Sequence, residues 1–497
     1  MAEQEALEGQ EGQSMQLDSL IDQLDRDFRP KSDEMRDEAQ AAVKTLAQIA
    51  LEGANIVPDN VVKTIKGMIE HIDVKLTQQV NEILHHEEFQ QLEGAWRGLA
   101  HLLGRTATGA DLKIKVMPIS KKELRRELGR TADSEFDQNI MFKKIYGTGY
   151  DMLGGDPYAA IVADYHFDHG SADVKILQSM SKIAAAAHAP FITGGSPSLF
   201  NLDDWTQLPD RKDLANIQTT APYAPWRAFR ESADARYVGL AMPRFLARTP
   251  YGPDNPVDEF GFTEAIDTND PSQFCWANSA YAMAANVTEA FKEYGWCSRI
   301  RGVESGGAVE NLATYTFPTE KGGYAAQCPT EVAIGDRREA ELAEAGLMPL
   351  VYKQNSNMAA FISAQSAHKP SKYEGENGAD ATKNAALGAR LPYMFACCRF
   401  AHYLKHMVRN KVGSHMERDD MQSWLGGWIQ NYVLNNASAS DEQKSRRPLA
   451  AAEVEVVADP ENPGQYHAKF FLRPHYQLEG ANVSLSLVSR LPSQQQG

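Results

Sequence analysis

The sequence has few cysteines, fewer basic than acidic residues and no long apolar run. Each of these features excludes some classes of protein. Its 497 residues include five cysteines and no C-x-x-C pair, a pattern that suits a reducing cytosol. The net charge of −16 argues against nucleic acid as a general partner. No apolar run approaches the ~20 residues of a membrane helix, and the start, MAEQEALEGQEGQ, is too polar for a signal peptide. We therefore expect a cytoplasmic protein without direct membrane insertion.

The common signatures of nucleotide, metal and hydrolase sites are also missing. The chain has no G-x-x-x-x-G-K-[ST], no H-E-x-x-H and no G-x-S-x-G. We therefore expect no cofactor and no bound metal, and the residues alone favour an interaction protein over an enzyme. One alternative stays open. His166, Asp168 and His169 follow a predicted strand, where α/β enzymes keep their sites, and would serve a metal- or nucleotide-dependent α/β enzyme.

What the sequence does contain is a mixed α/β pattern built around the stretch from Asp156 to Gly195. An apolar run at 158–163, a helical pattern at 174–187 and a second run at 191–193 predict a parallel strand–helix–strand crossover. The turn after its first strand has one glycine, unlike a phosphate-binding turn. Elsewhere we expect helices at 59–84, 87–103, 121–128, 226–232, 277–294, 384–410 and 418–433, and strands at 112–117, 237–242, 350–352, 359–363, 453–457, 466–472 and 483–491.

The N-terminal region is acidic and carries a short amphipathic helix. Residues 1–40 hold 12 acidic and 4 basic side chains, which is half of the net charge. Residues 1–14 have the composition of a disordered segment. The following apolar residues share one helical face: Leu17, Leu20, Ile21, Leu24 and Phe28. Such a short helix needs a groove, either on its own domain or on a partner that recognises it.

Two further stretches are candidate interaction surfaces. The predicted helix 384–410 places Arg399, Lys405 and Arg409 on a basic face, which either contacts an acidic partner or is simply solvated. The tail strands either pair within their own chain or add to the sheet of a neighbour. The residues that we expect to bind a neighbouring copy through these strands are Val454, Val456, Phe470, Leu472, Val483, Leu485 and Leu487.

Six long blocks, in order, resemble the large contractile-sheath subunit of bacterial type VI secretion systems, the TssC/VipB family. The resemblance covers the chain from about Leu17 to its end. The blocks are EILHHEEFQQLEGAWRGLAHLL (82–103), PWRAFRESADARYVGLAMPRFLARTPYG (225–252), YGWCSRIRGVESGGAVENL (294–312), CPTEVAIGDRRE (328–339), RFAHYLKHMVRNKVGS (399–414) and FLRPHYQLEGANVSLSLVSRLP (471–492).

The resemblance implies a structural protein without enzymatic activity. Members pair with a small sheath subunit (TssB/VipA) and stack helically around a tube of Hcp above a baseplate. Contraction drives the tube out, and the ClpV unfoldase recycles contracted sheath through an N-terminal helix. The basic face would contact the tube or a neighbouring copy.

With this resemblance we divide the chain into four parts. Residues 1–58 form an acidic N-terminus with the recognition helix, and 59–110 a helical region that pairs with the small subunit. Residues 111–434 form an α/β sheath body. Residues 435–497 form a linker with strands that join a sheet between protomers.

Overall fold

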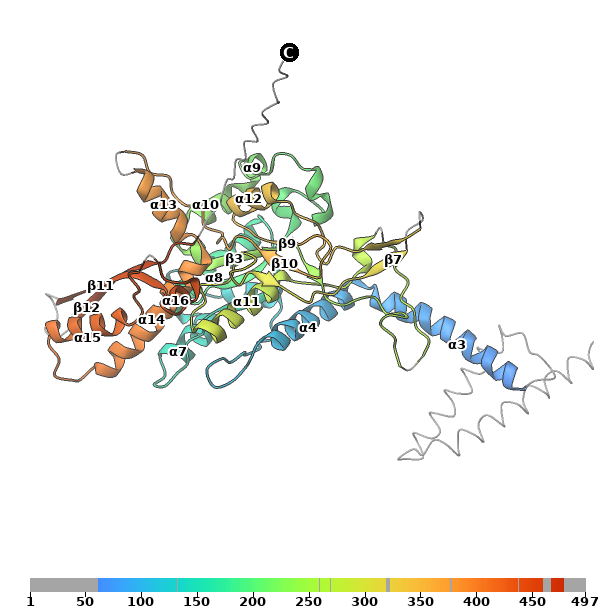
Figure 1. The fold of residues 1–497 in the computed structure, drawn as a ribbon, viewed down its shortest axis with the longest axis horizontal. Coiled ribbons are helices and arrows are strands. Elements are labelled where there is room, and N and C mark those ends of the chain that lie inside the picture. The colour runs from blue at the N-terminus through green and yellow to red at the C-terminus, as the bar shows by residue number, and fades with distance from the viewer. Residues whose placement is uncertain are drawn as a thin grey trace, which may run out of the picture. The chain divides into compact units, whose positions relative to one another are not determined.

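The fold is described from a computed structural model, which covers residues 61–477 apart from 132, 259, 269, 319–321, 376–377, 437 and 459–465 (Figure 1). The chain forms two compact units. The first comprises residues up to Arg97 with Leu246–Trp276 and Ala313–Gln327, and the second comprises the rest. Within the described ranges, no helix is long and apolar enough to cross a membrane.

Helices of at least eight residues supply most of the framework. They are α3 (Val61–Leu84), α4 (Glu87–Arg105), α5 (Lys121–Leu128), α8 (Ser171–Ala187), α10 (Ala224–Glu231), α11 (Ser279–Tyr294), α12 (Asp336–Glu344), α13 (Gly378–Gly388), α14 (Leu391–Lys411) and α15 (Arg418–Gln430). Shorter helices include α6 (Ile140–Phe142), α7 (Thr148–Tyr150), α9 (Leu214–Ile217) and α16 (Asp441–Arg446).

The second unit is built on a six-stranded mixed sheet. Its strand order is β1-β2-β3-β9-β10-β6, with parallel pairing from β1 to β9 and antiparallel pairing at β10 and β6. The predicted crossover is confirmed, because α8 joins the parallel neighbours β1 and β2. The strands are β1 (Ile161–Phe167), β2 (Phe191–Gly195), β3 (Val238–Met242), β9 (Met348–Tyr352), β10 (Ala359–Phe361) and β6 (Ala308–Val309).

Apolar side chains cover both faces of this sheet, as a parallel sheet requires. Phe167 and Phe191 point into the main core with Leu177 of α8 and Trp226 of α10. Val162 points the other way, into a smaller cluster with Ala284 and Ala285 of α11. Successive strand residues thus face opposite helices, which explains why these strands read as continuous apolar runs.

The first unit contains α3, the beginning of α4 and long irregular segments. Its apolar cluster joins Leu246, Phe274 and Trp276 to Ile266 and Tyr315. The strands β7 (Thr316–Pro318) and β8 (Tyr324–Ala326) form an antiparallel pair. Two-residue strands lie at β4 (Phe245–Leu246) and β5 (Trp276–Ala277).

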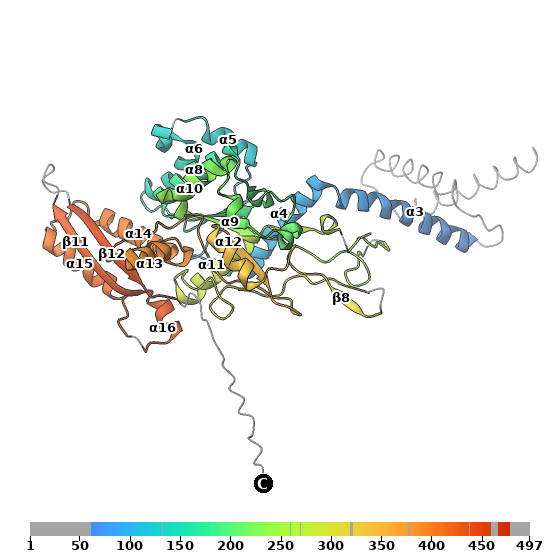
Figure 2. The same cartoon turned by 90° about the horizontal axis from the view of Figure 1, so that it is seen from above.

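The C-terminal part of the second unit is a β-hairpin packed on two helices. The strands β11 (Leu449–Ala458) and β12 (Tyr466–Pro474) pair antiparallel and lie along α14 and α15 (Figure 2). Val454 and Val456 are buried against Phe400 and Leu425 of these helices. Along β12, half-buried residues alternate with exposed ones, as predicted for a strand with one covered face.

Two predicted elements are wrong in this structure. Residues 112–117 alternate like a strand but are assigned to none. The helix predicted at 384–410 is two helices, α13 and α14, with Pro392 in the first turn of the second. Proline disfavours helical geometry in the residue before it, so Pro392 begins a helix and does not continue one. The predicted helix at 17–28 and the strand at 483–491 lie outside the described residues.

Candidate functional sites

The three residues of the enzyme alternative lie at the end of β1 and just after it, and each side chain has a different surrounding. His166 belongs to β1, whereas Asp168 and His169 lie in the loop that follows. Asp168 accepts the N–H of Gly170 at 2.6 Å, which closes the turn before α8. His169 stacks on Tyr223 with 3.9 Å between ring centroids. His166 lies against Gly194, where a Cβ would come within 2.8 Å of its ring. Burial, together with nearby Arg244 and Lys121, lowers the pKa of His166 to about 3, so the ring is neutral at pH 7.

These three side chains therefore do not converge on a common point. Within the residues that the structure covers, no group of three or more His, Cys, Asp or Glu side chains could hold a metal ion. Lys121 ties the loop to α5, donating to the His166 carbonyl at 2.7 Å and to Asp173 at 2.6 Å. The contacts are those of a loop that connects a strand to a helix.

The basic residues of α14 all make contacts within the chain. Arg409 donates to the carbonyls of Tyr150, Asp151 and Met152, at the end of α7 and just after it. Lys405 lies over the ring of Tyr150 at 4.6 Å, and burial lowers its pKa. Arg399 lies over the ring of Tyr403 at 4.7 Å. Their contact with a tube or a neighbouring subunit stays a prediction.

The β11–β12 hairpin is a two-stranded sheet, and among the described strands none pairs with the outer edge of β12. On its opposite edge, α15 reaches β11: Val456 donates its N–H to Gln422 at 3.2 Å, and Gln430 donates to the Ala452 carbonyl at 3.3 Å. Val456 is paired with Ala468 in the register. Val456 directs its N–H away from β12, so Val456 and Ala468 form a non-hydrogen-bonded pair. In such a pair both residues direct their N–H groups away from the partner strand. The N–H of Ala468 therefore points to the outer edge of β12.

The same alternation places Phe470 and Leu472 with their backbone groups outward and their side chains toward the core. The edge of β12 therefore offers a row of N–H and C=O groups of the kind that pairs with an added strand. Val483, Leu485 and Leu487, predicted in the same role, lie outside the described residues.

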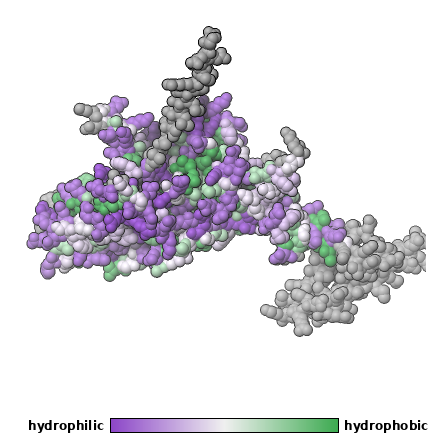
Figure 3. Space-filling model, in the orientation of Figure 1, coloured by the Kyte–Doolittle hydropathy of each residue, from purple (hydrophilic) through white to green (hydrophobic). Residues whose placement is uncertain are grey.

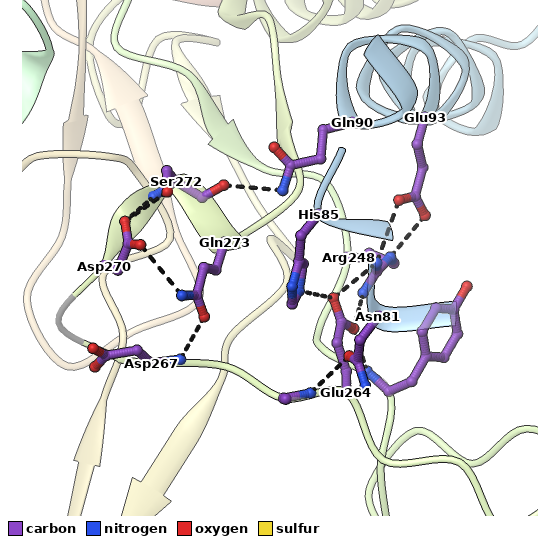
Figure 4. Close-up of polar contacts among 12 residues, drawn as sticks. Asn81, His85, Gln90, Glu93, Arg248, Glu264, Asp267, Asp270, Ser272 and Gln273 are labelled. Atoms are coloured by element: carbon purple, nitrogen blue, oxygen red, sulfur yellow. Dashed lines mark hydrogen bonds and ion pairs between the residues drawn. The ribbon is translucent and has the colours of Figure 1, made fainter. Parts of the chain in front are cut away.

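Sequence reasoning missed a buried ionic network in the first unit, centred on Arg248 (Figure 4). The guanidinium donates from Nε to Glu93 at 2.7 Å and from Nη1 to Glu264 at 2.6 Å. Arg248 and Glu264 are nearly inaccessible, with side-chain exposures of 6% and 1%. A second arginine, Arg97, contacts Glu93 at 2.7 Å.

Electrostatics within this network favour the charged forms. Burial alone would raise the pKa of Glu93, but its hydrogen bonds and attraction to Arg248 and Arg97 hold that pKa below its usual value. The two carboxylates likewise hold the pKa of Arg248 above its ordinary value, against the effect of burial. The network is thus two arginines balanced by two carboxylates.

Further polar contacts extend the network to the junction of α3 and α4. His85 lies 3.5 Å from Glu264, and Asn81 accepts the N–H of Ala265 at 2.9 Å. Gln90 donates to the Ser272 carbonyl at 2.9 Å. Figure 4 shows these side chains converging from the helices onto the segment 264–273. They fix the helix junction to an otherwise irregular segment.

Large apolar side chains are exposed on both helices of the first unit. On α4, Phe89, Leu92 and Trp96 follow at spacings of three and four and so share a face, with Trp96 63% exposed. Ile69, Leu76 and Ile83 form a similar row on α3, where Figure 3 shows hydrophobic surface. Rows of this kind typically mark a protein–protein contact.

Comparison with solved structures finds distant likenesses to the anti-feeding prophage. One is a chain of its baseplate, with a TM-score of 0.37 and 9% identity. The match covers 64% of this chain and 66% of the baseplate chain. Another is its helical sheath in the contracted state, with a TM-score of 0.31, 10% identity and coverage of 63% and 66%. At these scores neither likeness supports a conclusion about fold or function.

Comparison of sequences gives much stronger matches. The chain is 54% identical over 470 residues to the type VI secretion system sheath protein TssC1 of Pseudomonas aeruginosa, covering 94% of both proteins. Residues 66–368 match the VipB family model, described as EvpB/VC_A0108, tail sheath N-terminal domain. Residues 380–491 match the model of its tail sheath gpW/gp25-like domain. The chain belongs to the VipB family of type VI secretion sheath proteins.

Proposed function

We propose that this chain is the large, non-enzymatic subunit of a type VI secretion sheath and acts in the cytoplasm. It pairs with a small sheath subunit (TssB/VipA), and the heterodimers polymerise helically around an inner tube of Hcp above a baseplate. Contraction of the polymer propels the tube. The observation that carries the proposal is the 54% identity to a sheath protein over 94% of both chains.

The exposed apolar row on α4 supports a contact with the small subunit. Phe89, Leu92 and Trp96 present one continuous face, and Leu92 is 56% exposed. A helix or groove of the small subunit would cover this face, since apolar burial drives association and aromatic residues dominate such contacts. This contact falls within the region 59–110 that we assign to pairing.

Replacing Trp96 with Asp tests this contact. Because the side chain is exposed, the variant should fold, yet a charge in the interface should cost at least about tenfold in affinity. The measurement is the amount of small subunit that co-purifies with the tagged chain. Gln91→Asp, an exposed change on the same helix, is the control and should retain the partner. Equal recovery with both variants would contradict the assignment.

The open edge of β12 supports strand exchange between protomers. A strand from a neighbouring copy, which we assign to residues 483–491, would add to this edge through main-chain hydrogen bonds. Such bonds can persist while the linkers around them bend, which a contracting lattice requires. Arg399, Lys405 and Arg409 are a further proposed contact with the tube or a neighbour, although their described contacts are intramolecular.

We further propose that the amphipathic helix 17–28 is recognised by the ClpV unfoldase. The sequence predicts an apolar face with acidic flanks for this helix, a pattern that suits a peptide bound in a partner's groove. Deleting residues 1–28 should leave tube assembly unchanged and slow the disassembly of contracted sheath by ClpV, as followed by light scattering with ATP. Normal disassembly of the deleted form, or failure of its tubes to form, would contradict this role.

A further inference from the structure

The chain leaves the described body of the second unit at Gln477, where one residue makes three hydrogen bonds. Arg301 donates from Nε to the Gln477 Oε1 at 2.6 Å. The Gln477 side-chain amide donates to the Ser298 carbonyl at 2.7 Å, and its backbone N–H donates to the Tyr393 hydroxyl at 3.0 Å. Three residues earlier, β12 has already ended at Pro474. The neighbouring Tyr476 side chain is largely exposed.

The groups that hold Gln477 belong to firmly placed parts of the fold. Arg301 opens a tight loop, in which Gly302 donates to the Phe361 carbonyl of β10 at 2.7 Å. Phe361 in turn donates to the Gly307 carbonyl at 2.9 Å. A Cβ on Gly307 would overlap the Phe361 carbonyl, so the close approach requires glycine. Tyr393 lies in the first turn of α14 and is nearly buried.

These contacts matter because of the direction from which a pull would come. Residues 478–497 continue beyond Gln477, and a neighbour that held them would pull on this point. Without a fixed residue, the pull would reach the end of β12 at Pro474 and open the β11–β12 ladder one pair at a time. The three bonds made by Gln477 share such a pull, and one of them involves a charged arginine, which strengthens it.

We propose that Gln477 is the anchor of the C-terminal arm (residues 478–497), which transmits load from the arm to the central sheet through Arg301 and to α14 through Tyr393, and so spares the β11–β12 hairpin. This rests on the proposed function, because the load exists only when the arm is engaged in a sheath. Gln477 is a positioning residue: it holds the arm in place and does not itself contact the neighbour.

Hydrogen exchange on the full chain, co-expressed with the small subunit, tests the proposal. The amides of the hairpin are compared between unassembled complex and tubes, in the wild type, in Gln477→Ala and in Tyr393→Phe. In tubes, both variants should show hairpin exchange at least about tenfold faster than the wild type, the ratio expected when one or two hydrogen bonds are lost. Before assembly, exchange in the hairpin should be equal in all three. Tyr476→Ser, beside the anchor, should match the wild type throughout.

Other results separate the possible failures. Tubes of Gln477→Ala with wild-type exchange in the hairpin would overturn the anchor and leave the sheath function standing. Faster hairpin exchange already in the unassembled variants would show a general structural role and would also overturn it. Absence of tubes from the wild type would overturn the proposed function, and the anchor with it.

Discussion

At the scale of single residues, Arg248 is the centre of the buried ionic network in the first unit. Its side chain is buried between Glu93 and Glu264, each bonded through two guanidinium nitrogens. A buried ion pair gives little net stability against an apolar substitute, but removing one partner leaves an uncompensated charge. The main effect of the network is therefore to fix the position of the α3–α4 junction against residues 246–276. Its net contribution to the free energy of unfolding is small.

Replacing Glu264 with Gln should loosen this segment. The amide keeps the shape but loses the charge opposite Arg248, which should lower the local opening free energy by about 3 kcal/mol. Hydrogen exchange of the Tyr251 amide, which donates to Glu264 at 2.9 Å, measures the effect directly.

The matched control is Glu341→Gln on α12. Its carboxylate pairs with Arg337 and Arg338 at a more exposed surface, where ion pairs contribute about 1 kcal/mol or less. An effect of Glu264→Gln no larger than that of the control would mean that the buried network does not hold the segment.

The sequence could not reveal this network in advance. Arg248 lies 155 positions from Glu93 and 16 from Glu264, and no local spacing links an arginine to such partners. By contrast, His166 and His169 are close in sequence, yet their side chains face different neighbours. The residues of the Arg248 network are distant in sequence but close in space, whereas the two histidines are close in sequence but have separate surroundings.

At the scale of elements, the hairpin β11–β12 carries the clearest functional consequence. Its register directs the N–H of Ala468 outward, so that position can be altered without breaking a bond to β11. An edge strand tolerates proline where the N–H faces away from the sheet. Ala468 is therefore a place where strand addition can be tested separately from folding.

Ala468→Pro should prevent tube formation while the complex with the small subunit stays folded. The ring removes one outward N–H and blocks the approach of a neighbouring strand, whereas the ladder to β11 at Lys469 and Phe471 remains. Electron microscopy gives the assembly state, and circular dichroism the fold. Ala468→Val adds similar bulk but keeps the N–H and should form tubes. Tubes from the proline variant would contradict addition at this edge.

Periodicity predicted most long elements because they are strongly patterned. The crossover β1–α8–β2, the helices α3, α4, α11 and α15, and the hairpin strands all lie close to their expected positions. The failures have local causes. Residues 112–117 alternate between apolar and polar side chains but have no partner among the described strands. The sequence of one segment does not show whether another segment pairs with it. The break before α14 was missed because the apolar pattern continues across Pro392, although this proline marks the start of a new helix.

At the scale of the whole molecule, the sequence matches place the α/β body in a family of sheath proteins. The described surface presents apolar rows on α3 and α4 and, on β12, a strand edge that no other described strand pairs with. The sequence could predict the α/β body, because the apolar patterns of its strands and helices reflect their burial in the core. It could not predict which surfaces other chains cover, because an exposed apolar residue has the same pattern as a buried one.

The most direct test of the central claim is negative-stain electron microscopy of this chain co-expressed with the small subunit. We predict long hollow tubes with a helical repeat that contain both proteins. Well-folded complexes that remain discrete small particles under the same conditions would contradict a sheath function for this chain.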